Sequence, residues 1–275
     1  MYLAYNTNGL AHHRLEDAFH LLADLGYEGV ALTPDVCHLD PFATEERDWE
    51  KARALLDKLV LKCVIETGAR YVLDPRRKHR PNLISPDPAD GIRRLNFYRR
   101  CLKQARVLGA PLISIWSGPL EPGDDPAAAF ERLVERLPKL LDEAAEAKVE
   151  VCFEPEPGHL IDGHVRYRER RKRLGRKDLM TTIDLGHLIV TEPGAPQDHL
   201  AEFAPSLRNV QVDDARRGVH EHLVPGAGEI DFAPIFKELK RLKYQGPVAM
   251  ELSRDSHRAA EVAAQAHYKI APLLR

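Results

Sequence analysis

Long hydrophobic runs, paired cysteines and an excess of charge of one sign are all lacking in this sequence of 275 residues. No apolar run approaches the length of a membrane span, and the stretch MYLAYNTNGLAHHRLEDAF has no basic segment followed by an apolar core. We therefore expect neither a membrane partner nor a signal peptide. The four cysteines show no paired spacing, which favours a reducing, cytoplasmic location.

The positive and negative charges of the sequence nearly balance. A formal net charge of −2 at pH 7 supplies no broad positive field of the kind that nucleic-acid-binding proteins use. No nucleic-acid partner is expected, and a small anionic or neutral ligand is the better expectation. The composition, with 44% apolar and 30% charged residues, is that of a soluble globular protein able to bury a sizeable core.

Short β-rich runs alternate with longer amphipathic stretches along the whole sequence. This alternation predicts parallel strands joined by helical crossovers, and eight such units predict an α/β fold, a single closed (β/α)8 TIM barrel domain over residues 1–275. An open, doubly wound sheet is the alternative, but no glycine-rich fingerprint follows an early strand. The expected strands are 3–7, 29–33, 62–67, 111–118, 149–158, 180–190, 207–214 and 247–253. The expected helices are 14–26, 44–59, 90–109, 126–148, 232–244 and 255–274.

Acidic residues end three of the apolar runs: Glu154, Asp184 and Glu251. In a barrel of this type the catalytic groups come from the carboxyl ends of the strands, so these three acids should converge. Converging carboxylates repel one another unless a positive charge lies between them, and oxygen ligands suit Mn²⁺, Mg²⁺ or Co²⁺. A lone strand-end acid is more often a helix cap or an ion-pair partner. Asp213 and Asp214 could each have such a role, as a cap or as a partner of an arginine.

Three histidines lie near these strand ends. His187 follows Asp184 by three residues and could be a second ligand, bind substrate, or face solvent from a loop. His220 and His222 are one residue apart in an expected loop, 215–231, so in an extended segment they would point the same way. They could reach the site together, with His222 touching the substrate, or they could be surface residues.

A second expected loop, 68–86, is rich in cations. It is either a solvated surface loop or a lid that contacts an anionic substrate, such as a phosphorylated sugar or a sugar acid. Glu66, just before this loop, could contact Arg70 or a substrate hydroxyl. The basic residues of the loop are Arg70, Arg76, Arg77, Lys78, His79 and Arg80.

Four segments resemble the xylose isomerase-like barrel superfamily, which includes tagatose and psicose epimerases, inosose dehydratases and endonuclease IV. They are FEPE, IDLGH, NVQVDD…HEHLVPGAGEIDF and AMELS, and the resemblance covers essentially the whole chain. It implies one divalent ion, Mn²⁺ before Mg²⁺, Co²⁺ or Zn²⁺, held by Glu154, Asp184, Gln211 and Glu251. Gln211 stands where the family has a histidine, and its oxygen can bind a hard cation without offering an imidazole nitrogen.

The resemblance also implies the roles of further residues. Glu154 and Glu251 would act as acid and base, moving a proton on the carbon beside a carbonyl through an enediolate. His187 matches a substrate-binding histidine, and Arg217 stands where the epimerases carry a substrate-binding arginine. Trp116 would form an apolar wall for a sugar, unless it only packs in the core.

The expected function is therefore a metal-dependent sugar or sugar-phosphate isomerase or epimerase, which could pair as a homodimer. A lyase that dehydrates a keto-polyol after the same proton abstraction is the first alternative, and a barrel that binds a metabolite without catalysis is another. An abasic-site endonuclease is disfavoured because IETG and IWSG replace the histidines that this family takes from its third and fourth strands.

Overall fold

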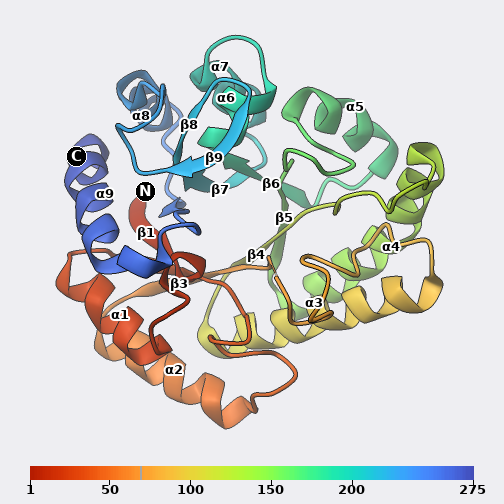
Figure 1. The fold of residues 1–275 in the computed structure, drawn as a ribbon, viewed down its shortest axis with the longest axis horizontal. Helices are drawn as coiled ribbons and strands as arrows, with labels where there is room; N and C mark the ends of the chain where they lie inside the picture. Colours follow the sequence, from red (N-terminus) through yellow and green to blue (C-terminus); the bar gives the residue numbers. More distant parts are fainter. Residues whose placement is uncertain (69) are drawn as a thin grey trace.

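A closed barrel of eight parallel strands forms the centre of the computed structural model, which describes residues 1–68 and 70–275 (Figure 1). The barrel closes because its first strand pairs with its last, with Tyr2 opposite Pro247 and Tyr5 opposite Met250. The predicted barrel is confirmed, and the open sheet is excluded. In order around the barrel the strands are β1 (Tyr2–Asn6), β2 (Gly29–Leu32), β3 (Lys62–Glu66), β4 (Leu112–Ile115), β5 (Glu150–Phe153), β6 (Leu179–Asp184), β7 (Leu207–Val212) and β10 (Pro247–Met250).

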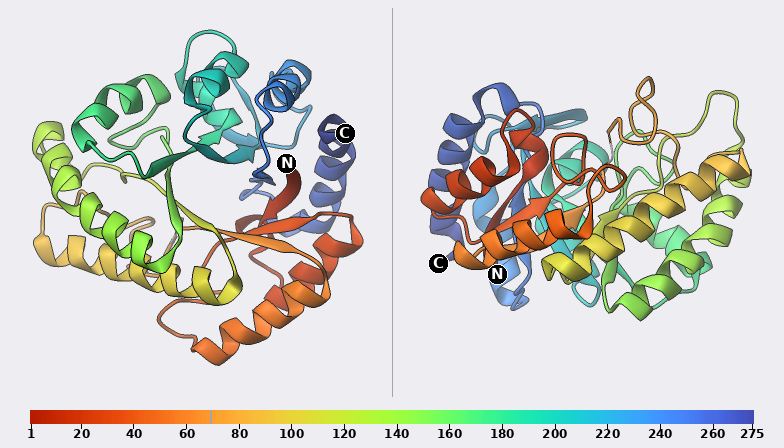
Figure 2. Two further views of the ribbon diagram at one scale, coloured as in Figure 1. Left: turned by 180° about the vertical axis from the view of Figure 1, so that it is seen from behind. Right: turned by 90° about the horizontal axis from the view of Figure 1, so that it is seen from below.

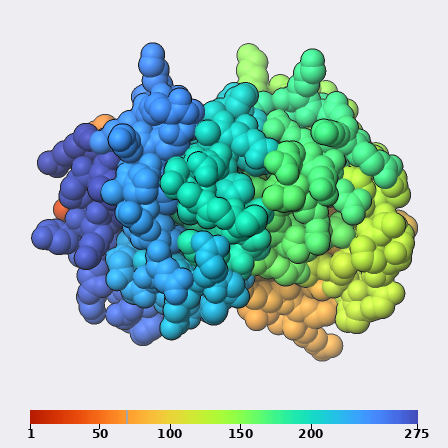
Figure 3. All heavy atoms as spheres, turned by 90° about the horizontal axis from the view of Figure 1, so that it is seen from above, coloured from red at the N-terminus to blue at the C-terminus, as the bar shows by residue number. Residues whose placement is uncertain are grey.

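Helices surround the barrel, and the two chain termini lie near each other (Figure 2). Consecutive segments of the chain lie side by side along the outer wall (Figure 3). Within residues 1–68 and 70–275, no helix is both long and apolar enough to cross a membrane. The helices are α1 (Leu15–Asp24), α2 (Glu46–Lys58), α3 (Pro88–Leu108), α4 (Pro126–Ala147), α5 (His164–Leu174), α6 (Leu185–Thr191), α7 (Pro196–Phe203), α8 (Phe232–Arg241) and α9 (Ala259–Leu274), with short 3-10 turns at Thr7–Leu10 and Ser256–Arg258.

Aspartate-proline pairs start the two longest helices. The Asp87 carboxylate accepts a hydrogen bond from the backbone N–H of Ala89 at 2.8 Å, and α3 then begins with a proline. Asp125 caps α4 in the same way. Proline suits the first helical position because no partner is needed there for its missing N–H. The expected helix 126–148 is also continuous through Pro138.

The apolar run 180–190, expected as one strand, divides at Asp184 into strand β6 and the short helix α6. The Asp184 carboxylate accepts a hydrogen bond from the backbone N–H of His187 at 2.9 Å, which caps the new helix. The first five residues of α6 are buried. Its sequence therefore remains apolar and gives no sign of the change from strand to helix.

Residues 215–231, expected as a loop, contain part of an antiparallel hairpin of β8 (Asp214–Arg216) and β9 (Val219–Leu223). Strand β7 correspondingly ends at Val212 rather than at residue 214. Helices α5 and α7 lie outside the expected elements. The sequence of α5 is mostly basic and buries only three side chains, so it shows no apolar period.

The interior of the barrel changes from apolar to polar along the strands. Side chains two positions apart on a strand share a face, so each strand contributes several successive side chains to the interior. Nearer the amino ends, the interior is filled by Tyr2, Ala4, Ala31, Val64, Leu112, Cys152 and Ala249. Two residues further along the same strands, the side chains are those of Asn6, Thr33, Glu66, Ser114, Glu154 and Glu251.

These polar side chains contact one another. Thr33 Oγ1 lies 2.6 Å from Asn6 Oδ1 and 3.0 Å from Glu66 Oε2. Ser114 Oγ lies 2.7 Å from the Thr182 hydroxyl and 3.3 Å from Glu154 Oε2. The apolar layer below closes one end of the barrel, so polar chemistry is confined to the carboxyl ends of the strands.

The outer layer between barrel and helices provides a test of stability. Phe153 on β5 is fully buried, and its ring stacks on Tyr167 of α5 with centroids 4.9 Å apart. We expect Phe153→Ala to lower the free energy of unfolding by about 3–5 kcal/mol, because the ring leaves a cavity. Urea denaturation measures the change. Tyr268→Ala on α9 is the control, since Tyr268 is 78% exposed; equal losses in the two variants would contradict the assigned packing.

Candidate active site

The carboxyl ends of the strands open into a cavity of about 370 Å³. A volume of this order suits a small-molecule ligand. Most of the side chains that line the cavity are polar, and both charge signs are present. They include the expected site residues Glu66, Arg70, Trp116, Glu154, His222 and Glu251.

Glu154, Asp184 and Glu251 form what we call the carboxylate cluster. One carboxylate oxygen from each of the three residues lies within 4.8 Å of the others. Glu154 is 3% exposed and Asp184 is fully buried. The structure therefore brings together the three acids that the sequence placed at strand ends. Asn8 supports the cluster, because its side-chain amide donates a hydrogen bond to Glu251 Oε1 at 2.8 Å.

Burial and mutual repulsion disfavour negative charge in this cluster. Burial raises the pKa of Glu154 well above the usual carboxyl range, and the charge of Glu251 raises it further. Burial also raises the pKa of Glu251 well above that range, and the charges of Glu66 and Asp184 add to the shift. A cation among these oxygens would relieve the repulsion.

Gln211 lies beside the carboxylate cluster. It is 1% exposed, and its strand position pairs with Asp184 on one side and with Ala249 on the other. Gln211 Oε1 and Nε2 have no hydrogen-bond partner in the described part of the chain, and Asp184 Oδ2 has none either. Buried polar atoms without partners cost about 1–3 kcal/mol each. These unpartnered atoms, with three carboxylates beside them, fit a divalent cation that prefers oxygen ligands.

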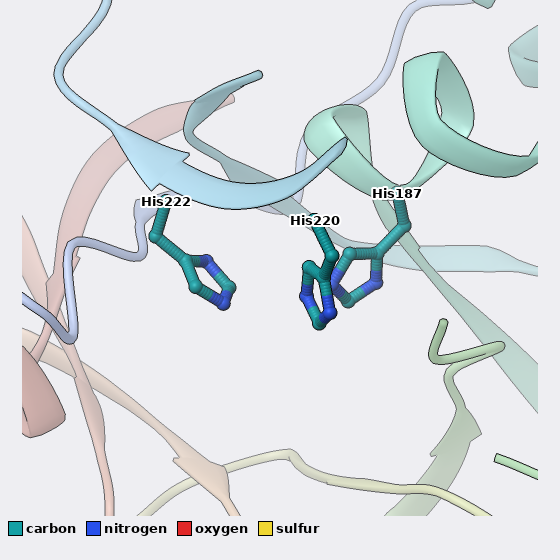
Figure 4. A group of neighbouring side chains, drawn as sticks. All are labelled: His187, His220 and His222. Atoms are coloured by element: carbon teal, nitrogen blue, oxygen red, sulfur yellow. The ribbon is translucent and has the colours of Figure 1, made fainter. Parts of the chain in front are cut away.

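His187, His220 and His222 form a second group, which we call the histidine cluster (Figure 4). Their ring centroids are 5.0–6.0 Å apart. His187 comes from α6 and is 1% exposed, so it does not face solvent, while His220 and His222 come from β9. Burial lowers the pKa of His187 and of His222 to about 3 and that of His220 to about 4, so these rings are neutral near pH 7.

Asp214 holds the hairpin that carries His220 and His222. Its two carboxylate oxygens accept backbone hydrogen bonds of 2.8–3.0 Å from four residues that lie after it in the chain. Asp214 therefore neither holds an arginine nor caps a helix. The four donors are Ala215, Gly226, Gly228 and Ile230.

Two expected substrate-binding residues are not among the described residues that line the cavity: His187 and Arg217. Arg217 is exposed and donates a hydrogen bond to the backbone carbonyl of Glu192 at 3.2 Å. The spacing of six residues after Gln211 does not bring it to the cavity, because Arg217 lies in the exposed turn between β8 and β9. Arg254, which the sequence gave no reason to choose, lines the cavity instead.

Trp116 belongs both to the core and to the cavity wall. It is 3% exposed, and the His159 ring stands edge-on to it with centroids 4.8 Å apart. The guanidinium of buried Arg94 lies 4.2 Å from the centre of the Trp116 ring. The two interpretations of Trp116 from the sequence, core packing and an apolar wall of the cavity, are therefore compatible.

Ion pairs hold three of the six basic residues of the expected cationic loop. Arg70 binds Asp35 at 2.6 Å, so its expected neighbour Glu66 is free to accept from Thr33 instead. Arg77 pairs with Asp74, and Arg80 pairs with Glu121 at 2.8 Å. The loop residues that line the cavity are Gly68, Arg70, Lys78 and His79.

The family model of the xylose isomerase-like TIM barrel matches residues 19–270 of this chain. A D-psicose 3-epimerase from Enterocloster bolteae is 24% identical over 178 residues, which are 62% of this chain and 57% of that protein. A 2-oxo-tetronate isomerase from Pectobacterium atrosepticum is 23% identical over 155 residues, 54% of this chain and 57% of that protein. The matches thus span less than two thirds of either relative.

A solved structure of an L-ribulose 3-epimerase resembles this chain in fold. The two superpose with a TM-score of 0.81 at 17% sequence identity, and the match covers 99% of this chain and 94% of the other. At this identity the similarity establishes the shared barrel.

The Asp214 contacts predict that removing this carboxylate loosens the hairpin. We expect Asp214→Ala to lower the free energy of unfolding by about 3 kcal/mol, because buried N–H groups lose a charged acceptor. Hydrogen exchange should accelerate at Gly226, Gly228 and Ile230. Asp231→Ala is the control: Asp231 only caps α8, so its loss should cost about 1 kcal/mol and leave those three amides protected. Unchanged exchange in Asp214→Ala would refute the role.

Buried acids predict a pH dependence of the metal-free protein. Burial raises the pKa of Glu66 to about 7 and that of Glu156 to about 8, from about 4.3 in the unfolded chain. An acid whose pKa is raised by folding contributes its full stabilisation when the pH is below its pKa in the unfolded chain. This stabilisation is lost as the pH rises through its pKa in the folded protein. The buried histidines act in the opposite sense, but only below their unfolded pKa of about 6.5.

Between about pH 6.5 and 9 the free energy of unfolding should therefore fall as the pH rises. Urea denaturation in the presence of a chelator measures this slope. Glu156→Gln should flatten it, whereas Glu146→Gln, at an exposed position on α4, should not. A wild-type curve that is level in this range would show that the acids are not buried as described.

Proposed function

The chain belongs to the xylose isomerase-like TIM barrel family, as its sequence motifs suggested, and we propose that it is a metal-dependent isomerase or epimerase of a sugar or sugar phosphate. The observation that carries this proposal is the convergence of Glu154, Asp184 and Glu251 at one polar end of the barrel. The names of the two relatives, an epimerase and an isomerase, support the same class of reaction.

The proposed metal ligands are Glu154, Asp184, Gln211 and Glu251. The ligand atoms are oxygens, and within residues 1–68 and 70–275 no cysteine joins the group of Glu154, Asp184 and Glu251. This favours Mn²⁺, with Mg²⁺, Co²⁺ and Zn²⁺ as alternatives. A bound divalent ion would supply polarisation of a substrate carbonyl. Without an imidazole at position 211, the site should prefer hard cations more strongly than a site that includes histidine.

Glu154 and Glu251 are the proposed acid and base. Strands β5 and β10 are separated in the barrel by β6 and β7, so the two carboxylates reach the chamber from different sides. One would take the proton from the carbon beside the carbonyl, and the electron pair of that bond would move to the carbonyl oxygen. The other would return a proton to the opposite face.

The remaining proposed substrate contacts follow the cavity wall. Trp116 offers an apolar surface for a sugar ring, and Glu66 can accept a hydrogen bond from a hydroxyl. Arg70 and His222 are the polar contacts at the loops. Arg217 is left out of the proposed site because its side chain is directed to Glu192. The four free thiols support a reducing, cytoplasmic setting for the reaction.

Deuterium exchange tests the proposed function. Ketoses, keto-sugar acids and their phosphates are incubated with Mn²⁺-loaded protein in D2O, and products are followed by NMR and mass spectrometry. We expect a stereoisomer or positional isomer that carries deuterium beside the carbonyl. Glu154→Gln and Glu251→Gln should each lower kcat by about 10²- to 10⁴-fold, and Asp184→Asn should lower bound Mn²⁺.

Glu146→Gln is the matched control, because it makes the same change at an exposed position. A product that has lost one water would assign the chain to the lyases instead. The absence of exchange with every substrate, together with undisturbed ligand binding in both glutamate variants, would favour a binding protein without catalysis.

A further inference from the structure

We infer that Lys78 and Arg254 form an anion-binding subsite at the mouth of the cavity and select substrates that carry a phosphate or carboxylate group. This inference rests on the proposed function, because it assigns one part of the substrate of the same site. It adds two residues that determine specificity and take no part in the proposed proton transfer.

The permanent positive charges of the cavity wall differ in their partners. Among the described residues, the arginine and lysine side chains that line the cavity are Arg70, Lys78 and Arg254. The Asp35 carboxylate lies 2.6 Å from Arg70 and neutralises its charge. Within residues 1–68 and 70–275, no carboxylate lies within ion-pairing distance of Lys78 or Arg254. These two cations are therefore available to a ligand.

Lys78 and Arg254 reach the mouth from different parts of the barrel and meet beside His220. Lys78 follows β3 and Arg254 follows β10, and these strands are separated by β1 and β2. Arg254 Nη2 donates a hydrogen bond to the backbone carbonyl of His220 at 2.9 Å. Burial lowers the pKa of His220 to about 4, and the charges of both Arg254 and Lys78 contribute to the shift. Both cations are thus close enough to act on one group of a ligand.

The loop on either side of Lys78 is fixed in place. The backbone N–H of His79 donates a hydrogen bond to the carbonyl of Arg70 at 2.8 Å, and the His79 ring centre lies 5.2 Å from that of Trp116. His79 has a φ of 63°, in a region that side chains other than glycine rarely adopt. On the other side, Arg77 is held by an ion pair. These contacts hold Lys78 at the cavity wall.

Acids and available cations occupy different depths of the cavity. Glu154 is 3% exposed, whereas Lys78 and Arg254 are exposed at the mouth. The remaining acids of the wall include Glu66 and Glu156, which would repel an anionic substrate if no cation were present. A substrate whose carbonyl lies among the deep carboxylates would therefore place an anionic group at the mouth, where Lys78 and Arg254 attract it.

The two side chains suit the oxygens of phosphate and carboxylate groups. A guanidinium offers a planar fork of N–H donors that matches these groups, and an ammonium supplies a compact point charge. A phosphate monoester carries a charge of about −1.5 to −2 at pH 7, so it matches two cations better than a carboxylate does. We expect both groups to bind at Lys78 and Arg254, and the phosphate to bind more tightly.

Polyols that lack a carbonyl test the subsite without turnover. The binding of ribitol, ribitol 5-phosphate, ribonate and inorganic phosphate to the Mn²⁺-loaded full-length protein is measured by isothermal titration calorimetry. We expect ribitol 5-phosphate to bind about 10-fold or more tightly than ribitol, because each hydrogen bond to a charged group is worth about a factor of ten. This advantage should shrink as the ionic strength rises. Tighter binding of ribonate would support the subsite and assign it to sugar acids.

The variants remove each cation in turn. Lys78→Met and Arg254→Met should each weaken ribitol 5-phosphate about 10-fold, and the double variant should lose the advantage of the phosphate. The affinity for ribitol should be unchanged, which also shows that the variants are folded. Lys78→Arg keeps the charge and should keep the advantage. Lys237→Met combined with Arg14→Met, at two exposed positions, is the matched control and should change neither affinity.

The inference is overturned if the wild type binds ribitol and its anionic forms equally, or if it binds none of the four probes. It is also overturned if the advantage of the phosphate survives in the double variant, because the bound Mn²⁺ would then be its source. Absence of hydrogen exchange in a protein that shows the advantage would count against the proposed function alone. Exchange on neutral ketoses with equal binding of ribitol and ribitol 5-phosphate would count against the subsite alone.

Discussion

The carboxyl ends of eight parallel strands meet at one end of the barrel, and the chemistry of the site depends on this constraint. Because side chains alternate along a strand, acids at equivalent levels of β5 and β10 must face the same interior. The apolar layer beneath them excludes water from that side. Buried Glu154 and partly buried Glu251 therefore lie beside like charges, and each must either keep a proton or lie near a cation. Protonation and the stability of the barrel are coupled through these groups, and the proposed metal would join the same coupling.

The same alternation gives neighbouring acids opposite roles. Asp213 points toward the interior and lies beside His222, whereas Asp214 points the other way and binds the backbone of the hairpin. Both carboxylates lie against glycines, Asp213 against Gly186 and Asp214 against Gly228, where a Cβ atom would collide with them. A shift of one residue in β7 would exchange the two acids and remove both the support of the hairpin and the neighbour of His222.

The barrel and the carboxylate cluster could be predicted because both follow from periodicity. Eight apolar runs predict eight strands, and an acid at the end of a run predicts its place in the chamber. The boundary at Asp184 could not be predicted, because buried helix α6 has no polar face to show a helical period. Arg217 was assigned because it lies six residues after Gln211. A spacing in sequence does not fix the position of a side chain in space when the chain turns in a hairpin. Glu156 was difficult to identify because its neighbours His187 and His220 come from other parts of the chain.

The segment FEPE places two acids with different neighbours at one strand end. Glu154 and Glu156 are two residues apart, and the first joins the carboxylate cluster while the second approaches the histidine cluster. His187 lies between them: its Nδ1 is near Glu154 and the Pro155 carbonyl, and its Nε2 is near Glu156. An ion among Glu154, Asp184 and Glu251 would therefore leave Nε2 of His187 without a partner. His187 Nε2 and His220 Nε2 are buried without a hydrogen-bond partner among the described residues, so the chamber keeps polar atoms that one ion at the carboxylates does not satisfy.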